Sequence, residues 1–295
     1  MAERISVAKT YKLFVGGAFP RSESGRTYQV VDTKGAFLAN AAQGSRKDAR
    51  DAVVAARKGF GSWSTATAYN RGQVIYRIAE MLEGRRADFA ELVAHSEDVS
   101  DNAARATVDS AIDRLVHYAG WTDKIAAVFG GANPVAGPFF AFSVPEPTGV
   151  VAAVAPPDDS LLGLVSVIAP IICSGNAMVV VASERRPLPA VALAEVLATS
   201  DLPAGVVNIL TGSPAEIFPW LAEHGDVNAL DLTGADDQQR ADWERAAAGT
   251  VKRTFAPART DFAQPPGTAR LRAFLETKSV WHPTGSLSLS GGSAY

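Results

Sequence analysis

The sequence predicts an α/β protein built around a parallel sheet with helices on both faces. Between residues 147 and 234, short apolar runs rich in Val, Ile and Ala alternate with longer helical patterns. Apolar strands of this kind are typical of parallel sheets that are buried on both faces, and the alternation is that of βαβ units. The predicted strands are Gly149–Ala155, Ala177–Ala182, Val206–Leu210 and Val227–Leu232, and the predicted helices are Leu161–Cys173, Pro189–Thr199 and Pro214–His224.

The N-terminal part, residues 1–133, is predicted to add a hairpin and a helical scaffold to this sheet. Ser45 with Asp48 three residues later forms a capping-box pattern, and Asn70 is expected to cap the next helix. The predicted elements are strands around Gly16-Gly17 and at Tyr28–Val31, helices that begin at Ser45 and Asn70, and a third helix over residues 101–120.

Composition indicates a globular protein with no nucleic-acid or membrane partner. The 295 residues are 47% hydrophobic, which is ample for a core, and 28 Lys plus Arg against 31 Asp plus Glu give a net charge of −3. No run of like charge marks a polyanion-binding surface. No stretch has the apolar length of a spanning helix, and the first twelve residues lack a signal-peptide core.

Cysteine and histidine usage argues against metal and disulfide chemistry. One cysteine in the chain excludes an internal disulfide framework and fits a reducing, cytoplasmic setting. The four histidines, His95, His117, His224 and His282, show no ligand spacing, so we expect no metal site.

Residues at the turns and at the ends of elements in the βαβ region resemble those of a known family. Ala169-Pro170, Gly175-Asn176, Ser183-Glu184, Pro187-Leu188 and Leu202–Asn208 occur in one order and at matching spacing. The order and spacing of these motifs resemble those of the NAD(P)-dependent aldehyde dehydrogenase superfamily. This resemblance implies a Rossmann-like sheet. It also implies a small antiparallel oligomerisation element.

The resemblance implies a domain plan in which the catalytic domain is missing and the chain is a truncated member. The Glu-Leu-Gly-Gly and Gly-Gln-x-Cys motifs of the family are absent. The apolar strand Phe139–Val144 and the segment Leu271–Trp281 resemble the two parts of the oligomerisation element, the latter pairing with a neighbouring subunit's hairpin. The plan is an N-terminal part at 1–133, an oligomerisation hairpin at 134–148, the βαβ portion at 149–249, a linker at 250–270, a C-terminal oligomerisation strand at 271–285 and a disordered Ser/Gly-rich tail at 286–295.

No catalytic residue is expected. Cys173 lies at the end of an apolar helix, where the helix dipole disfavours a thiolate, and is predicted to be structural. Asp158 stands at the position of the family's oxyanion-binding Asn, yet an ionised carboxylate offers no donor and adds charge of the wrong sign. Asp158, Asp159 or Ser160 is instead expected to cap the helix that begins near Leu161.

Cofactor binding is predicted to be lost at most of the family's contact positions. The resemblance implies Glu184, Gly212 and Gly234 as the remaining candidate contacts for NAD or NADP. Val181 replaces the Lys that bonds the adenosine ribose in the family.

The expected pyrophosphate site is also altered. Ala235 lacks the family's serine hydroxyl, and Asp236 and Asp237 occupy the first turn of the next helix. A helix N-terminus attracts phosphate, but two carboxylates there satisfy the dipole and repel a dianion by on the order of a few kcal/mol each. We therefore expect no bound cofactor.

Three functions remain open at this point. The first is a non-catalytic structural or regulatory subunit that pairs with itself or with an active aldehyde dehydrogenase through Phe139–Val144 and Leu271–Trp281. The alternative is an NAD(P)-binding oxidoreductase with residual or partner-dependent activity. The third is a remnant without function.

Overall fold

The structure is a computed structural model that describes residues 9–258 and 260–285. A five-stranded parallel sheet in the order β10-β9-β6-β7-β8 forms its centre. The βαβ prediction is confirmed, because each predicted strand and helix between residues 149 and 232 is present with its ends within two residues of the predicted ones. These elements are β6 Val150–Val154, α6 Leu162–Cys173, β7 Ala177–Val181, α7 Leu188–Ala198, β8 Val207–Leu210, α8 Pro214–Glu223 and β9 Ala229–Asp231.

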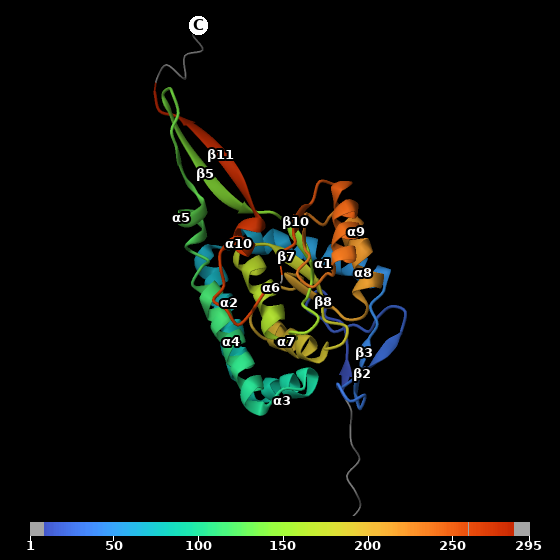
Figure 1. Cartoon of the computed structure of the whole chain (residues 1–295). Helices are drawn as coiled ribbons and strands as arrows, with labels where there is room; N and C mark the ends of the chain where they lie inside the picture. Colours follow the sequence, from blue (N-terminus) through green and yellow to red (C-terminus); the bar gives the residue numbers. More distant parts are fainter. Residues whose placement is uncertain (1–8, 259, 286–295) are drawn as a thin grey trace, which may run out of the picture.

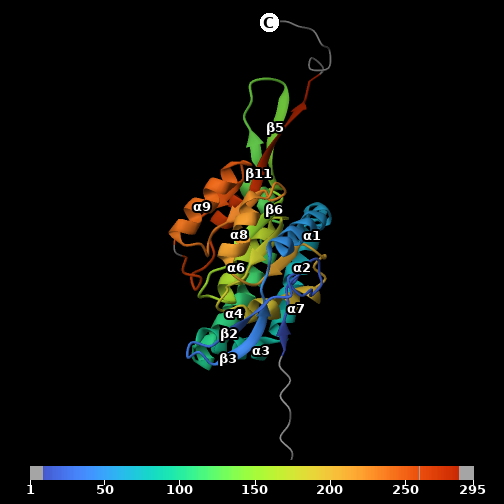
Figure 2. The same ribbon diagram turned by 90° about the vertical axis from the view of Figure 1, so that its right-hand side faces the viewer.

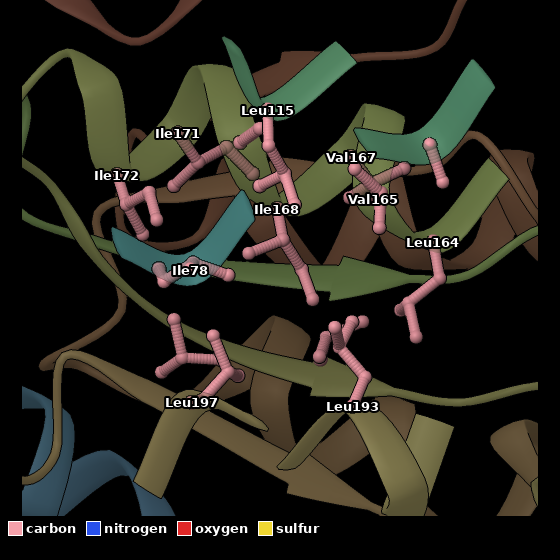
Figure 3. Close-up of a cluster of buried hydrophobic side chains, with 14 of the residues drawn as sticks. Ile78, Leu115, Leu164, Val165, Val167, Ile168, Ile171, Ile172, Leu193 and Leu197 are labelled. Carbon is pink, nitrogen blue, oxygen red and sulfur yellow. The ribbon is translucent and has the colours of Figure 1, made fainter. Parts of the chain in front are cut away.

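The sheet is covered on both faces because its strands carry apolar residues on both sides. In β6, Val151 and Ala153 join one core cluster, whereas Val150 and Val154 join the other. The first cluster packs under α2, α4, α6 and α7, and Figure 3 shows Ile168 of α6 among Leu115, Ile78 and Leu193 from these helices. The second cluster packs under α1, α8 and α9.

The N-terminal part supplies the helical scaffold as predicted, with three differences. The two strands predicted around Gly16-Gly17 do not form, because the turn closes only the single bridge Val15–Ala18, and the first strand lies earlier in the chain. Ser45 and Asp48 form the predicted capping box of α1. The second helix is capped by Thr67, whose side chain accepts the N–H of Asn70, so the prediction that Asn70 is the cap is wrong. A strand at Phe37–Ala42 was missed. The elements are β1 Thr10–Tyr11, β2 Thr27–Val31, β3 Phe37–Ala42, α1 Arg46–Thr65, α2 Ala68–Glu83, α3 Arg86–Glu97, α4 Asp101–Ala119 and α5 Ile125–Phe129.

A three-stranded antiparallel arm stands clear of this body in both views (Figures 1 and 2). Its order is β11-β5-β4, with β4 at Gly131–Asn133, β5 at Phe139–Pro147 and β11 at Leu275–Pro283. The sequence predicted pairing of the last strand with a neighbouring subunit's hairpin. In the structure β11 pairs with β5 of its own chain along all nine residues, because the chain returns directly to the base of the arm.

The segment between the sheet and the arm is more ordered than the predicted linker at 250–270. After α9 (Asp237–Ala248), β10 (Arg253–Phe255) adds the fifth strand of the sheet beside β9. Leu271 was predicted to lie in a strand, but it belongs to α10 (Ala269–Ala273), which packs on α6. Residues 286–295, predicted to be a disordered tail, lie outside the described residues.

Candidate functional site

The sheet brings the predicted site residues together at the carboxyl ends of its strands. The loops that follow β6, β7, β8 and β9 all leave from the carboxyl ends of parallel strands, which is where open α/β sheets place their ligands. Backbone hydrogen bonds hold these loops together: the Gly234 N–H donates to the Val154 carbonyl at 3.1 Å, and the Ala182 N–H to that of Leu210 at 2.9 Å.

Asp158 lies on the surface of this edge and is paired with cations. The Arg185 guanidinium lies 3.0 Å from its carboxylate, and that of Arg186 lies at 3.9 Å. Arg186 also donates to the Asp158 backbone carbonyl. An Asp at this position therefore does not leave a bare negative charge, because the loop after β7 brings two guanidinium groups to it.

Leu161 occupies the N-cap position of α6 without a capping side chain, and Asp159 lies two residues before it. The Asp159 carboxylate accepts the Gly163 N–H at 2.6 Å, whereas Ser160 donates both its N–H and its hydroxyl to Glu97 at the end of α3. The prediction that Asp158, Asp159 or Ser160 is the cap is therefore wrong, although Asp159 still accepts one N–H of the first turn. Burial raises the pKa of Asp159 to about 6 against the opposing hydrogen bond from Gly163, and the Glu97 carboxylate raises it further.

Glu184 is exposed at the end of β7, and the structure brings it close to a residue that the sequence did not single out. Burial raises the pKa of the Tyr28 hydroxyl, and the nearby Glu184 carboxylate raises it further. The same hydroxyl lies near the Gly212 backbone, which lowers the pKa. Strand β2 therefore brings a phenol to the position where the resemblance implies ribose contacts.

Both candidate glycines are required by backbone packing. A Cβ on Gly234 would lie 2.0 Å from the Ala155 carbonyl oxygen. Gly212 adopts a φ of +119°, and a Cβ there would lie 3.0 Å from the Gly44 nitrogen. Since contacts within the chain demand glycine at both positions, glycine there is no indication of a ligand.

The N-terminus of α9 is already capped. The Asp236 carboxylate accepts the Gln239 N–H at 2.8 Å, and the Gln239 side chain accepts the Asp236 N–H at 3.1 Å. Ala235 is buried, and Asp237 is exposed in the first turn. A phosphate at this helix end would have to displace the capping carboxylate and lie beside Asp237.

A cavity of about 340 Å³ lies next to this helix end, between α8 and α9. Its lining includes Ala215, Gln239 and Trp243, and Trp243 packs against Phe218 with ring centroids 4.4 Å apart. The sequence analysis missed this cavity because its walls come from two helices without a recognisable motif.

Cys173 is buried at the end of α6, as predicted. Its thiol donates to the Tyr118 carbonyl at 3.2 Å, and burial raises the pKa of Cys173 to about 12. The thiol therefore stays protonated at neutral pH and has no access to a substrate from solvent.

A buried ionic cluster beside the site was missed by sequence reasoning. Asp231, the fully buried last residue of β9, pairs with Arg270 of α10. The Thr233 hydroxyl donates to Asp231 at 2.5 Å and accepts from Arg270 at 2.9 Å. This cluster attaches the C-terminal segment to the carboxyl end of the sheet, while Arg114 of α4 donates to the carbonyls of Phe262 and Gln264.

The described residues hold no group of three or more His, Cys, Asp or Glu side chains that could bind a metal ion. No helix among them combines the length and the apolar character needed to cross a membrane.

The sheet order, the helices on both faces and the loops at the strand ends define a Rossmann-like α/β protein with an added β-arm. Comparison with known proteins then gives the family. A profile described as "Aldehyde dehydrogenase family" matches residues 19–256, and the chain belongs to this family.

Relatives of known sequence and structure agree with this assignment. "Aldehyde dehydrogenase, cytosolic 1" of Elephantulus edwardii is 33% identical over 247 residues, which cover 82% of this chain and 49% of that protein. HpcC of Thermus thermophilus has a TM-score of 0.79 at 30% identity, covering 83% of this chain and 47% of that one. An NAD+ complex of aldehyde dehydrogenase from Bacillus cereus has a TM-score of 0.78 at 25% identity, covering 83% and 50%. The chain thus spans about half the length of the relatives it matches.

Proposed function

We propose that this protein is a non-catalytic member of the aldehyde dehydrogenase family that acts as a structural or regulatory subunit. In this role it pairs through its β-arm with itself or with an active aldehyde dehydrogenase. The proposal combines a site that lacks the means for aldehyde oxidation with an interaction element that is fully formed.

The observation that carries the proposal is the state of Cys173, the one cysteine of the chain. Aldehyde oxidation through a covalent intermediate needs an accessible thiolate. The Cys173 thiol is buried against Tyr118, with its pKa raised to about 12. No other residue of this chain supplies a thiol.

The residues at the expected cofactor site, at the carboxyl end of the sheet, support the same conclusion. Asp236 caps the helix end that would receive a pyrophosphate, and Asp237 lies in the same turn. Asp158 is bound to Arg185, so this loop presents an internal ion pair in place of a free hydrogen-bond donor. A dinucleotide would have to break these contacts in order to bind.

The β-arm supports the subunit role. Phe140 at its tip is 53% exposed and Trp281 is 58% exposed, although the arm consists of only three strands and projects from the body (Figure 1). Exposed aromatic side chains on a projecting sheet favour a protein partner.

The alternative function is an NAD(P)-binding oxidoreductase with residual or partner-dependent activity. The cavity between α8 and α9 favours it, since it offers space for an aromatic ring beside the helix end, and Glu184 remains exposed for a ribose hydroxyl. A relative of known structure contains NAD+.

Calorimetric titration with NAD and NADP separates the two functions. We expect no saturable heat for the natural chain up to millimolar ligand. Asp236→Ser is the matched variant, since serine can still cap α9 while one charge is removed. Saturable binding to the natural chain would support the alternative and overturn our interpretation of this edge.

An activity assay tests the regulatory role. The chain alone should give no aldehyde-dependent NADH formation, whereas mixing it with a full-length aldehyde dehydrogenase of the same source should change that enzyme's assembly size or rate. Phe140→Asp should abolish the change, because it places a charge on the contact face. A chain that neither self-associates nor binds a dehydrogenase at any concentration would contradict the subunit function and favour the remnant.

A further inference from the structure

A cavity of about 480 Å³ lies where the body meets the β-arm. It is enclosed by α5, α10, β10 and the adjoining parts of β5 and β11, which Figure 1 shows around the base of the arm. A cavity of this volume can hold a small molecule, and none of the three candidate dinucleotide contacts lines it. Its lining residues are Val128, Phe129, Pro145, Arg253, Arg272, Leu275 and Thr277.

The apolar part of this lining is only partly covered by the fold. Val128 is aliphatic and yet 54% exposed, whereas Leu275 is buried. Phe129 packs against the core and stacks on Trp121 with ring centroids 6.4 Å apart, so its position is fixed. An apolar group in the cavity would cover Val128 and remove its surface from water.

The charged part of the lining carries one uncompensated cation. Among the described residues, no hydrogen-bond or ion-pair partner reaches the Arg272 guanidinium. Arg253 also lines the cavity, but its Nε and Nη2 each donate to the Glu276 carboxylate at 2.5 Å. Arg253 and Glu276 therefore neutralise each other, and Arg272 leaves the site with a net positive charge.

An apolar wall beside one free guanidinium fits a monocarboxylate that carries an apolar chain. A guanidinium can bind a carboxylate through two parallel hydrogen bonds, and such charge-assisted bonds are stronger than neutral ones. A neutral chain would leave Arg272 unpaired, and a short anion such as acetate would leave Val128 exposed. A dianionic phosphate ester would bring more negative charge than the one free guanidinium balances.

We infer that this cavity binds a medium-chain carboxylate, with its headgroup on Arg272 and its chain against Val128 and Phe129. The inference does not depend on the proposed subunit function. Because Pro145 of β5 and Thr277 of β11 line the same cavity, the bound molecule contacts the arm as well as the body.

Calorimetric titration with octanoate tests the site. Octanol is the uncharged match and acetate is the match without a chain, and each should bind about 10-fold more weakly or not at all, because each loses one of the two contacts. Octanoate should also raise the temperature of thermal unfolding, since it binds the folded chain.

Two variants and a control assign the contacts. Arg272 is exposed, so Arg272→Met should fold, and it should weaken octanoate binding by about 10-fold to 100-fold because the charge-assisted bonds are lost. Val128→Glu should abolish binding by placing a like charge beside the ligand. Arg245→Met on α9 is the control, since the Arg245 side chain is 75% exposed and lies outside the cavity, and it should bind octanoate as the natural chain does.

Four results would overturn the inference. They are no saturable heat with octanoate at millimolar concentration, equal binding of octanol, equal binding of acetate, and unchanged octanoate affinity in Arg272→Met. Equal binding of octanol would show a plain apolar groove, and equal binding of acetate would show a surface ion pair only.

Discussion

The buried pair between Asp231 and Arg270 should contribute strongly to stability, and Arg270→Met tests this. Asp231 is fully buried and the Arg270 side chain is 9% exposed, so neither charge is solvated in the folded state. The variant leaves the Asp231 carboxylate in the core with only the N–H and hydroxyl of Thr233 as donors. Removing one partner of a buried pair costs about 3–5 kcal/mol, and we expect a loss of about 3 kcal/mol or more in the free energy of unfolding.

The double variant separates the interaction from the burial of charge. Replacing both partners, as Asp231→Val with Arg270→Met, removes the unpaired charge and should cost about 0–2 kcal/mol, less than the single variant. The control is Arg26→Met, because Arg26 pairs with Glu216 at 3.5 Å on the surface. This exposed pair should change stability by about 1 kcal/mol or less.

Urea unfolding followed by fluorescence and circular dichroism supplies these free energies, provided that the two transitions coincide. The reasoning is refuted if Arg270→Met costs no more than Arg26→Met, or if the double variant is less stable than the single one. The first result would show that the pair adds little to stability, and the second that an unpaired Asp231 carboxylate is not the cause of the loss.

Three further predictions concern individual side chains. The stability of Asp159→Asn relative to the natural chain should rise between pH 4 and pH 6, by at most about 3 kcal/mol in the free energy of unfolding. The reason is that the raised pKa of Asp159 means that folding opposes ionisation of this carboxyl, so the natural chain loses stability as the pH rises. Gly234→Ala should lower the melting temperature strongly, since its Cβ would meet the Ala155 backbone, whereas Gly61→Ala in open space on α1 should stabilise by about 0.5–1 kcal/mol. Cys173 should resist a thiol reagent in the native protein and react completely in urea.

Each of these has an opposing outcome. A pH-independent difference for Asp159→Asn would show that this carboxyl titrates normally. Equal melting temperatures for Gly234→Ala and the natural chain would remove the packing explanation for that glycine. Rapid labelling of native Cys173 would place the thiol within reach of solvent and weaken the case for a non-catalytic chain.

The sequence was sufficient for the central sheet because its signals are local. Long apolar runs such as Ala177–Val181, bounded by glycine and proline, leave few alternatives to a buried strand. The capping box at Ser45 was equally readable, since both partners lie within one turn. The short strand at Arg253–Phe255 gave no such signal, because three residues carry no periodicity and its place is set by the neighbouring β9.

The candidate site was less accessible to sequence reasoning because its contacts are non-local. Arg185 lies 27 residues from Asp158, and Arg270 lies 39 residues from Asp231. From the sequence, Asp158 was expected to place a negative charge at the site. In the structure, Arg185 and Arg186 of the loop after β7 lie beside this carboxylate as counter-ions. The glycine requirement at Gly234 also comes from another strand, since it depends on how closely the Ala155 backbone approaches.

One core cluster contains Phe14 from the start of the chain together with Phe262, Leu271 and Leu275 from its last part. During synthesis, therefore, the hydrophobic layer beneath α6 stays incomplete until residue 275 has left the ribosome. The nascent polypeptide has to keep this surface from premature association over nearly its whole translation time. A chaperone that holds the growing chain until this layer is complete would raise the yield of native protein.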